Sequence, residues 1–322
     1  SAKAVRLLRA RHKLAMSGTP IENHLGELWS LFEFLNPGML GASSALRTAK
    51  GQAELPQTAR EMLSRAVRPF ILRRTKSQVA KELPERLEQT VICELDDDQR
   101  KMYDDLKAHY RRSLVEGTAD PVGSNSARVL EALLRLRQCA CHPALIDSRL
   151  ANRPAAKFDA LLRQLTELVE GGHKALVFSQ FVRLLQLLKS RLEHRQIAHA
   201  YLDGKTRDRR AVVEQFQNDP ACPIMLVSLK AGGVGLNLTA AEYVFLLDPW
   251  WNPAVEAQAI DRAHRIGQTR PVFAYRLIAR DTVEEKVLQL QQKKKDLAMS
   301  VITDKNALPG YLTKDDLMSL LM

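Results

Sequence analysis

Three polar side chains in the last third of the sequence have the spacing of one helix face. Gln258, Arg262 and Arg265 are four and then three residues apart, so a helix that begins at Pro253 would project them as one stripe. Two guanidinium groups held together form a planar, permanently charged clamp that suits phosphoryl oxygens. A solvated or ion-paired arginine face would have the same spacing, so the spacing alone leaves both interpretations open.

Two further features surround this stripe. An apolar stripe, Val255, Ala259, Ala263 and Ile266, would pack the same helix on a sheet. The pair Trp250-Trp251 ends the preceding strand candidate and could either pack in a core or contact the backbone or groove of a nucleic acid.

The stretch YLDGKT at 201–206 contains the Gly-Lys-Thr with which a phosphate-binding P-loop ends. A P-loop also requires a glycine five positions before its second glycine, because bare backbone N–H groups must surround the phosphates. That position holds His199, and Asp203 would place a carboxylate against phosphate oxygens. The stretch is therefore not a P-loop.

Two other stretches carry chemistry on one interpretation and structure on another. The loop SLKAGGVGLNL (228–238) has glycines that would let its backbone approach a phosphate, although a tight loop explains them equally well. Asp96, Asp97 and Asp98 follow a strand candidate like Mg²⁺ ligands, but they also begin a helical pattern, where acids suit the helix dipole. We favour the structural interpretation of the acids.

Cys139, Cys141 and His142 are possible metal ligands. A zinc site needs four ligands in matched pairs, and no second pair occurs nearby in the sequence, so we expect buried residues and no metal. Four cysteines in a chain of 322 residues do not form a disulfide framework, which favours a reducing compartment.

The elements that must position these residues alternate regularly after residue 174. Strands are expected at 174–179, 197–202, 223–229, 243–248 and 272–278, and helices at 181–195, 208–217, 253–266 and from 282. Such alternation predicts an α/β fold with a parallel sheet that carries helices on both faces. Asn252 with Pro253, and Thr282 with Glu285, provide helix starts.

Earlier in the chain the pattern differs. The first 36 residues predict a short strand, KLAMS (13–17), a turn and an amphipathic helix, whereas 37–155 is mostly helical with a boundary near 151–156. The first residues are cationic and helical and lack an initiator Met, which indicates a fragment. No apolar run approaches the length of about 20 residues that a membrane span requires, so we expect no membrane contact.

The chain carries a net charge of +11, which favours a polyanionic partner. Several segments then occur in one order: MSGTPIENHLGELWSLFEFLNP (16–37), RPFILRRTKSQVAKELPERLE (68–88), LRLRQCACHPALI (134–146), KALVFSQF, YLDGKT, the glycine loop and DRAHRIGQ. Together they closely resemble the Swi/Snf-type ATP-dependent DNA translocases of helicase superfamily two, from motif III to just past motif VI. The resemblance covers nearly the whole chain.

The resemblance implies a fold and a division of the chain. The family engine has two RecA-like lobes. It implies that 1–36 is the tail of the first lobe, 37–155 a helical insertion, 156–290 the second RecA-like lobe and 291–322 a helical extension. ATP and Mg²⁺ would be held mainly by the P-loop and Asp-Glu pair of a first lobe whose motifs this sequence lacks. We therefore expect this chain to be inactive as an ATPase on its own.

Residue roles carry over by position. The resemblance implies that Arg262 and Arg265 are the arginine fingers that stabilise charge on the transferring γ-phosphoryl group, and that Gly233, Gly235 and Gln258 line the nucleotide cleft. Ser17, Gly18 and Thr19 match the element that couples hydrolysis to lobe movement. The positions facing duplex DNA are Ser179, Gln180, Thr206, Arg209, Ser228, Lys230 and Trp251, with the loop before Arg209 one residue shorter than in the family.

Other functions remain alternatives to this translocase lobe. One is a stand-alone duplex-DNA-binding module, which Lys205 and Lys230 would serve. Another is an RNA-directed helicase lobe of the same superfamily, and a third is a docking surface made by the helical insertion and the run Lys293–Lys295. The uninterrupted second lobe is similar to bacterial members, so we expect a cytoplasmic, nucleoid-associated monomer whose partners are duplex DNA and a first RecA-like lobe.

Overall fold

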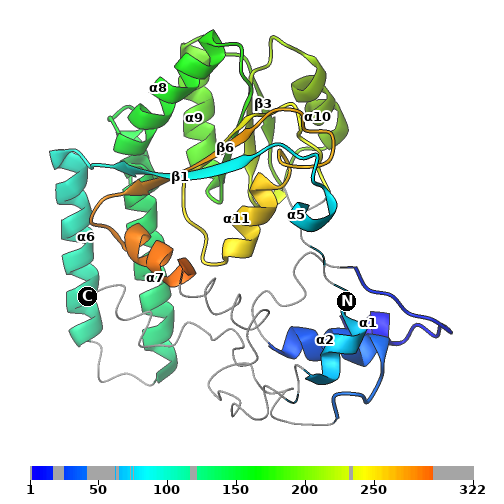
Figure 1. The fold of residues 1–322 in the computed structure, drawn as a ribbon. Helices are drawn as coiled ribbons and strands as arrows, with labels where there is room; N and C mark the ends of the chain where they lie inside the picture. The colour runs from blue at the N-terminus through cyan, green and yellow to red at the C-terminus, as the bar shows by residue number, and fades with distance from the viewer. Residues whose placement is uncertain are drawn as a thin grey trace. The chain divides into compact units, whose positions relative to one another are not determined.

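The computed structural model describes residues 2–16, 25–41, 62, 65–72, 74, 76–116, 122–231 and 235–292 (Figure 1). The chain divides into two compact units, Ser1–Arg74 with Leu290–Asp315, and Thr75–Gln289 with Asp316–Met322. Ser17, Gly18, Thr19 and Gly233 lie outside the described residues.

The first unit contains short helices joined by side-chain contacts. They are α1 (Ala2–Arg6), α2 (Leu25–Leu35) and a 3-10 turn at Arg68–Phe70. Arg6 donates to Ser30 Oγ at 2.8 Å and lies over the ring of Trp29, and Phe32 meets Phe70 edge to face. The amphipathic helix is thus present as predicted, but the predicted strand at 13–17 is wrong over its described part, 13–16, which forms no strand.

The second unit is built on a sheet of six parallel strands. Their bounds are β1 (Arg86–Cys93), β2 (Ala175–Ser179), β3 (His199–Leu202), β4 (Ile224–Ser228), β5 (Tyr243–Leu246) and β6 (Val272–Ala279), in the spatial order β1-β6-β5-β2-β4-β3. The five strands expected from the alternating pattern form within two residues of their predicted bounds. Central strands such as β2 and β4 are buried throughout, as a sheet covered on both faces requires.

Helices cover both faces of this sheet (Figure 1). The leucines of α8 (Ala156–Glu170) and α9 (Val182–His194) pack with Val177, Leu226 and Phe245 on one face. On the other face, α10 (Arg209–Asn218) contributes Phe216 and α11 (Pro253–Ile260) contributes Ala259 and Ile260. The predicted fold class, an α/β RecA-like sheet with helices on both faces, is confirmed.

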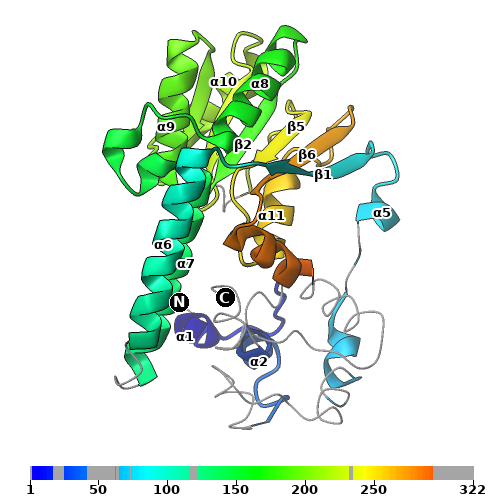
Figure 2. The same cartoon turned by 90° about the vertical axis from the view of Figure 1, so that its left-hand side faces the viewer.

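A pair of long helices precedes the alternating region. α6 (Asp97–Glu116) and α7 (Val122–Cys141) lie side by side (Figure 2), and the Gln99 side chain on α6 donates to the carbonyl of Cys139 on α7 at 2.9 Å. Asp96 accepts the Gln99 N–H at 2.7 Å, so these acids begin a helix as we favoured. Two 3-10 turns, Pro143–Leu145 and Ser148–Leu150, lead to α8.

The first strand of the sheet comes from an unexpected part of the chain. β1 lies within 37–155, the range expected to be mainly helical, yet it pairs along its whole length with β6. The first strand in the chain therefore completes one edge of the sheet by pairing with the last strand. Its apolar residues do not alternate strictly, which is why period-2 analysis did not place the strand in this sheet.

The cysteines and histidine at the end of α7 lie in the interior of the second unit. Cys139, Cys141 and His142 are almost completely buried, and His142 Nδ1 accepts the N–H of Ala144 at 3.0 Å to begin the next turn. Burial, with a contribution from the charge of Arg191, lowers the pKa of His142 to about 4. Within the described ranges, no group of three or more His, Cys, Asp or Glu side chains could hold a metal ion.

A buried ion pair joins α8 to the last described helix, 283–292. Lys157 Nζ lies 2.5 Å from Glu284 Oε2 and donates to the Leu247 carbonyl at 2.8 Å, and both charged side chains are about fully buried. Glu284 also accepts the Ala279 N–H at 2.9 Å. Thr282 begins this helix by accepting the N–H of Glu284 at 3.2 Å, so it is a helix start as predicted.

We expect the stability of the second unit to fall on acidification below neutral pH because of His142. A histidine whose folded pKa is depressed stays neutral in the folded state while the unfolded state binds a proton. The contribution is therefore complete above pH 6.5 and is lost as the pH falls toward about 4. Urea unfolding should show a loss of about 2–3 kcal/mol between pH 7 and pH 4.5 that is attributable to this group.

The His142→Asn variant tests this expectation, since its side-chain oxygen can still accept the Ala144 N–H. The variant should lose that part of the pH dependence, whereas His109→Asn on the exposed part of α6 should keep it. An unchanged pH dependence in His142→Asn would contradict the assignment.

Removing the buried lysine should be costly. Lys157→Met leaves the Glu284 carboxylate buried without its cation, and we expect a loss of about 3–5 kcal/mol in the free energy of unfolding. Lys189→Met is the matched control, because Lys189 pairs with Glu193 at 3.7 Å on the exposed face of α9, where such a pair contributes about 0–1 kcal/mol. Equal losses in the two variants would refute this interpretation.

Candidate functional site

The predicted DNA-facing residues follow the carboxyl ends of four strands. Ser179 is the last residue of β2 and Ser228 the last residue of β4. Gln180 and Lys230 follow these two strands, Thr206 follows β3 and Trp251 follows β5. Because β5, β2, β4 and β3 are neighbouring parallel strands, their carboxyl ends share one edge of the sheet. This edge is where open α/β sheets commonly bind ligands. The structure therefore brings these positions to one edge.

The LDGKT turn after β3 is closed by its own aspartate. Asp203 Oδ1 accepts the N–H groups of Lys205 and Thr206 at 2.8 and 3.1 Å, and Thr206 Oγ1 accepts the Asp203 N–H at 3.0 Å. These N–H groups are the ones that a P-loop would offer to phosphate, so the turn cannot be one. Lys205 is exposed, and Thr206 and Arg209 are half-buried.

The two predicted serines are buried, and their side chains do not face outward. Ser179 is completely buried and donates to Asp248, whose carboxylate also accepts the Gln180 N–H at 3.3 Å. Ser228 on β4 pairs in register with Ser179 on β2, and it is 2% exposed. Both side chains are therefore buried in this structure, and their expected contact with DNA stays a prediction. Gln180 is half-buried and Lys230 is exposed.

Residues 247–252, which we call the tryptophan loop, rest on a buried arginine of α7. The guanidinium of Arg137 lies 5.2 Å from the ring centre of Trp251 and 5.8 Å from that of Phe181. It also donates to the Pro249 carbonyl and lies 3.7 Å from Asp248. Trp251 is thus half-buried against a cation, with one part of its ring in the protein and one part accessible.

The arginine-bearing helix is shorter than predicted. Asn252 caps α11 by accepting the Ala254 N–H at 3.0 Å, with Pro253 in the first turn as expected. The helix ends at Ile260, and residues 261–265, which we call the arginine turn, follow in tighter turns. The Arg262 carbonyl accepts the N–H of Leu238 at 3.0 Å and so is drawn to a loop instead of continuing the helix.

This early end corrects the predicted apolar stripe. Ala259 and Ala263 are buried as expected, but Ile266 is 73% exposed, and Ile260 takes its place in the core. The same change means that Gln258, Arg262 and Arg265 do not lie on one continuous helix. Gln258 stays on α11 and is half-buried, whereas both arginines belong to the arginine turn.

The arginine turn holds two cations beside each other. Arg262 is 9% exposed, and its Nε has no hydrogen-bond partner. Burial and then the charge of Arg265 lower the pKa of Arg262. Neither arginine pairs with a carboxylate among the described residues. A nearly buried guanidinium in this state lacks the anionic partner that such groups normally have.

Arg265 reaches the glycine loop. It is exposed, and its Nη1 donates to the carbonyl of Gly235 at 3.3 Å. Gly235 has a φ of +46°, a left-handed conformation that favours glycine. Of the residues predicted for a nucleotide cleft, the structure therefore brings Arg262, Arg265 and Gly235 together.

Sequence reasoning did not single out three residues that hold these loops. Arg137 supports the tryptophan loop, Asp248 orders the end of β2, and Glu256 accepts the Trp250 N–H at 2.7 Å from within α11. All three are buried charged side chains, and burial of charge is not visible in a local pattern. The partners of Arg137 and Asp248 lie far away along the chain, whereas Glu256 binds Trp250, six residues earlier and before the start of α11.

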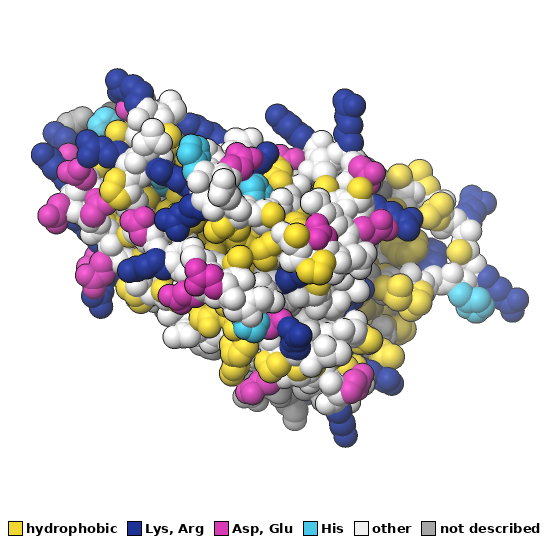
Figure 3. Space-filling view, turned by 90° about the horizontal axis from the view of Figure 1, so that it is seen from above, with side chains coloured by type: hydrophobic (Ala, Val, Ile, Leu, Met, Phe, Trp, Pro, Cys, Tyr) yellow, Lys and Arg dark blue, Asp and Glu magenta, His cyan; other side chains and the backbone are white. Residues whose placement is uncertain are grey.

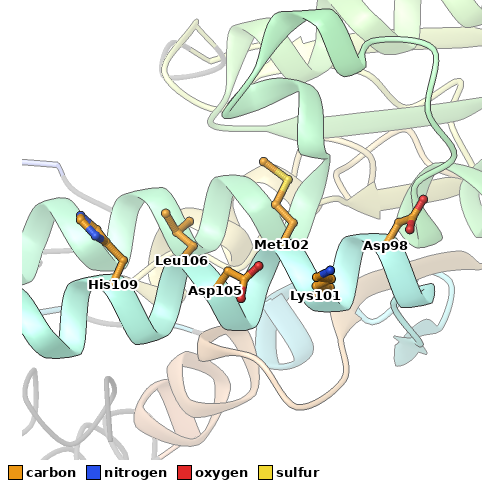
Figure 4. Close-up of a pocket in the computed structure, with 6 residues that line it drawn as sticks. All are labelled: Asp98, Lys101, Met102, Asp105, Leu106 and His109. Carbon is orange, nitrogen blue, oxygen red and sulfur yellow. The ribbon is translucent and has the colours of Figure 1, made fainter.

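One groove of the second unit lies away from these residues. A groove of about 450 Å³ runs along α6 and is lined by Asp98, Lys101, Met102, Asp105, Leu106 and His109 (Figure 4). It contains none of the predicted site residues. Figure 3 shows Lys and Arg side chains beside Asp and Glu side chains on the face seen from above, so the excess positive charge does not form one basic surface there.

No helix in the described ranges is long and apolar enough to cross a membrane.

Comparisons with known proteins agree with this architecture. The model of the SNF2-related domain matches residues 1–145, and that of the helicase conserved C-terminal domain matches residues 156–267. The uncharacterized ATP-dependent helicase MG018 of Mycoplasma genitalium is 36% identical over 322 residues, which are 99% of this chain and 30% of that protein. The chain thus spans about 30% of the length of that relative.

Two solved structures are similar to this chain. The Sulfolobus solfataricus SWI2/SNF2 ATPase core in complex with dsDNA is 33% identical, with a TM-score of 0.59 over 94% of this chain and 66% of that one. The C-terminal part of the Fun30 ATPase domain is 26% identical, with a TM-score of 0.58 over 74% of this chain and 96% of that one. The chain therefore belongs to the Swi/Snf-type family of helicase superfamily two.

Proposed function

We propose that the second unit is the second RecA-like lobe of an ATP-dependent double-stranded DNA translocase, and that it supplies arginine fingers to ATP. The observation that carries this proposal is the nearly buried Arg262, which has no carboxylate partner in the described part of the chain and is acted on by the charge of Arg265. Two neighbouring guanidinium groups would attract an anion of high charge density. The γ-phosphoryl group of ATP is such an anion.

The described residues fit one wall of an ATP site and do not form a complete site. Arg262 and Arg265 would neutralise charge on the phosphates, while Gly235 lets the backbone come close, together with Gly233 and Gln258 by position. Bound ATP would supply the phosphoryl group whose transfer to water releases the free energy for movement. We propose that Mg²⁺ and most of the nucleotide are held by a first lobe with a P-loop, a motif that this sequence lacks.

The DNA surface is proposed at the carboxyl edge of the sheet. Lys205 and Lys230 are exposed there, and Gln180, Thr206, Arg209 and Trp251 are partly accessible. Exposed lysines at such an edge suit phosphate oxygens and carry little sequence information. The solved Sulfolobus relative is in complex with dsDNA, which supports duplex DNA as the partner.

The proposed cycle follows from these two surfaces. ATP draws the two lobes together only when the fingers reach phosphates held on the first lobe, and hydrolysis removes that interaction. The opening and closing lobes would then step along one strand of a duplex. Within this proposal, Ser17, Gly18 and Thr19 couple hydrolysis to lobe movement, 156–290 is the core of the second lobe, and the protein acts as a monomer on the nucleoid.

A stand-alone duplex-DNA-binding module is the second candidate. The exposed Lys205 and Lys230 favour it, because they would bind phosphates whether or not a nucleotide is present. It differs from the first candidate in predicting no effect of ATP on DNA affinity, even when the first lobe is present.

The ATPase test compares the chain with a longer parent chain that includes the P-loop. We expect no DNA-stimulated ATP hydrolysis from residues 1–322 alone. In the parent, Arg262→Ala should lower kcat by about 10³-fold or more, because the finger acts on the transition state. Arg280→Ala, which removes an exposed partner of Glu94, is the control and should leave kcat within about twofold.

Activity in the short chain would be informative as well. Turnover that survives Arg262→Ala would come from a contaminant, whereas turnover abolished by Arg262→Ala would show that the short chain hydrolyses ATP and would refute the proposal.

The DNA test measures affinity for a duplex against salt concentration. Lys205→Ala and Lys230→Ala should each weaken binding equally for different sequences and reduce the slope of log K against log salt by about 1. Lys189→Ala, which removes an exposed helical pair on α9, is the control. Unchanged salt slopes in both lysine variants would contradict the proposed DNA surface. If the affinity of the parent chain for DNA does not change with ATP, the second candidate is favoured.

A further inference from the structure

A continuous line of ion pairs runs from the arginine turn to the tryptophan loop. It begins at Asp261, the residue before Arg262. The Asp261 carboxylate lies 2.7 Å from Lys76 Nζ on the short helix α5 (Lys76–Val79) and 3.0 Å from Arg86 Nη1 at the start of β1. Asp261 could otherwise form an ion pair with the neighbouring Arg262. Because Lys76 and Arg86 bind the Asp261 carboxylate, they help to keep Arg262 free of that ion pair.

Other contacts fix the same turn to the segment before β1. Lys76 Nζ also donates to the His264 carbonyl at 2.7 Å, and His264 Nε2 lies 2.8 Å from the Pro84 carbonyl. The arginine turn is therefore held by residues about 180 positions earlier in the chain. These residues belong to the part of the second unit that directly follows the first unit in the sequence.

The middle of the line crosses from β1 to β6. Arg86 Nε donates to Glu88 Oε1 at 2.9 Å, and Arg276 Nη2 donates to Glu88 Oε2 at 2.6 Å. Burial alone would raise the pKa of Glu88, but the hydrogen bonds and charges of Arg86 and Arg276 lower it to about 2. Glu88 is therefore a carboxylate that joins two arginines on neighbouring strands.

The far end of the line reaches the tryptophan loop. Arg276 Nε donates to Glu256 Oε2 at 2.8 Å, and Glu256 Oε1 accepts the Trp250 N–H at 2.7 Å. The Glu256 side chain is 2% exposed, so this end is nearly removed from solvent, whereas the Asp261 end is about 40% exposed. Ion pairs become less screened along the line, and the buried end should respond most strongly to loss of a partner.

We propose that this line, with Glu88 at its centre, couples the arginine turn to the tryptophan loop and makes hydrolysis sensitive to DNA. The inference rests on the proposed function for its two ends, but the line of contacts is a property of the described unit. Glu88 and Arg276 are positioning residues, since they contact neither surface and act through Asp261 and Glu256. A network of discrete contacts can transmit a shift because each link has made and broken states.

A purely structural role is the alternative. It predicts that Glu88→Gln would only lower stability, so that ATP hydrolysis with and without DNA would fall in proportion. Coupling predicts instead that the ratio of DNA-stimulated to basal hydrolysis falls. Coupling between sites typically changes an affinity or a response by about 5–150-fold.

The first experiment uses the 322-residue chain and amide hydrogen exchange. Glu88→Gln should speed exchange about fivefold or more at Trp250 and across 261–265, without changing β2 and β4. Arg86→Met should speed exchange at 261–265 only, because the Arg276–Glu256 end stays intact. The control is Glu94→Gln, which removes the Arg280–Glu94 pair. These two residues directly follow β6 and β1 and lie outside the line. No change at either segment in Glu88→Gln, or the same change in Glu94→Gln, would overturn the inference.

The second experiment uses the parent chain. Glu88→Gln should lower the DNA-stimulation ratio at least about fivefold, whereas Glu94→Gln should leave it unchanged. An unchanged ratio in Glu88→Gln would refute the coupling. Failure of the proposed function is a separate result, because it would appear as normal turnover in Arg262→Ala while the exchange experiment still showed that the two segments are linked.

Discussion

Arg262 is almost completely buried, its Nε has no partner among the described residues, and burial followed by the positive charge of Arg265 lowers its pKa. A folded chain tolerates such a guanidinium only if other interactions hold the surrounding backbone in place. Here the Arg262 carbonyl is bonded to Leu238 and the neighbouring Asp261 is taken by Lys76 and Arg86. The carboxylate next to Arg262 in the sequence, that of Asp261, is therefore paired with other cations.

The other buried carboxylates show the opposite arrangement. Asp248, Glu256 and Glu284 each accept from at least one backbone N–H and lie close to a cation. Asp203 closes its own turn in the same way with two N–H groups. The contrast matters because, among the described residues, the second unit pairs these buried carboxylates internally, whereas the nearly buried Arg262 has no carboxylate partner. This asymmetry is what a lobe requires if it meets an anion held by another body.

The parallel sheet separates the proposed surfaces and also connects them. Carboxyl ends of four strands gather Gln180, Thr206, Lys230 and the tryptophan loop, and α11 then carries the chain away from that edge to the arginine turn. The edge strand β1 and its neighbour β6 carry Arg86, Glu88 and Arg276, which connect the arginine turn with the tryptophan loop. A strand that comes from the region before the alternating pattern thus has a central place in the proposed coupling.

The sequence by itself determined the alternation of strands and helices, the parallel sheet that this alternation predicts, and the helix starts at Asn252 and Thr282. These follow from local periodicity, capping chemistry and the geometry of parallel strands. It also determined the family, because several motifs occur in one order. Only the tertiary structure decided that α11 ends at Ile260, that Ser179 and Ser228 are buried, that β1 joins the sheet, and that Arg137 supports Trp251. Each of these depends on a partner far away along the chain, such as Leu238 for Arg262 or Val272 for Arg86. Contacts of that kind leave no periodic signal, because neither residue's neighbours in sequence reveal what it will touch.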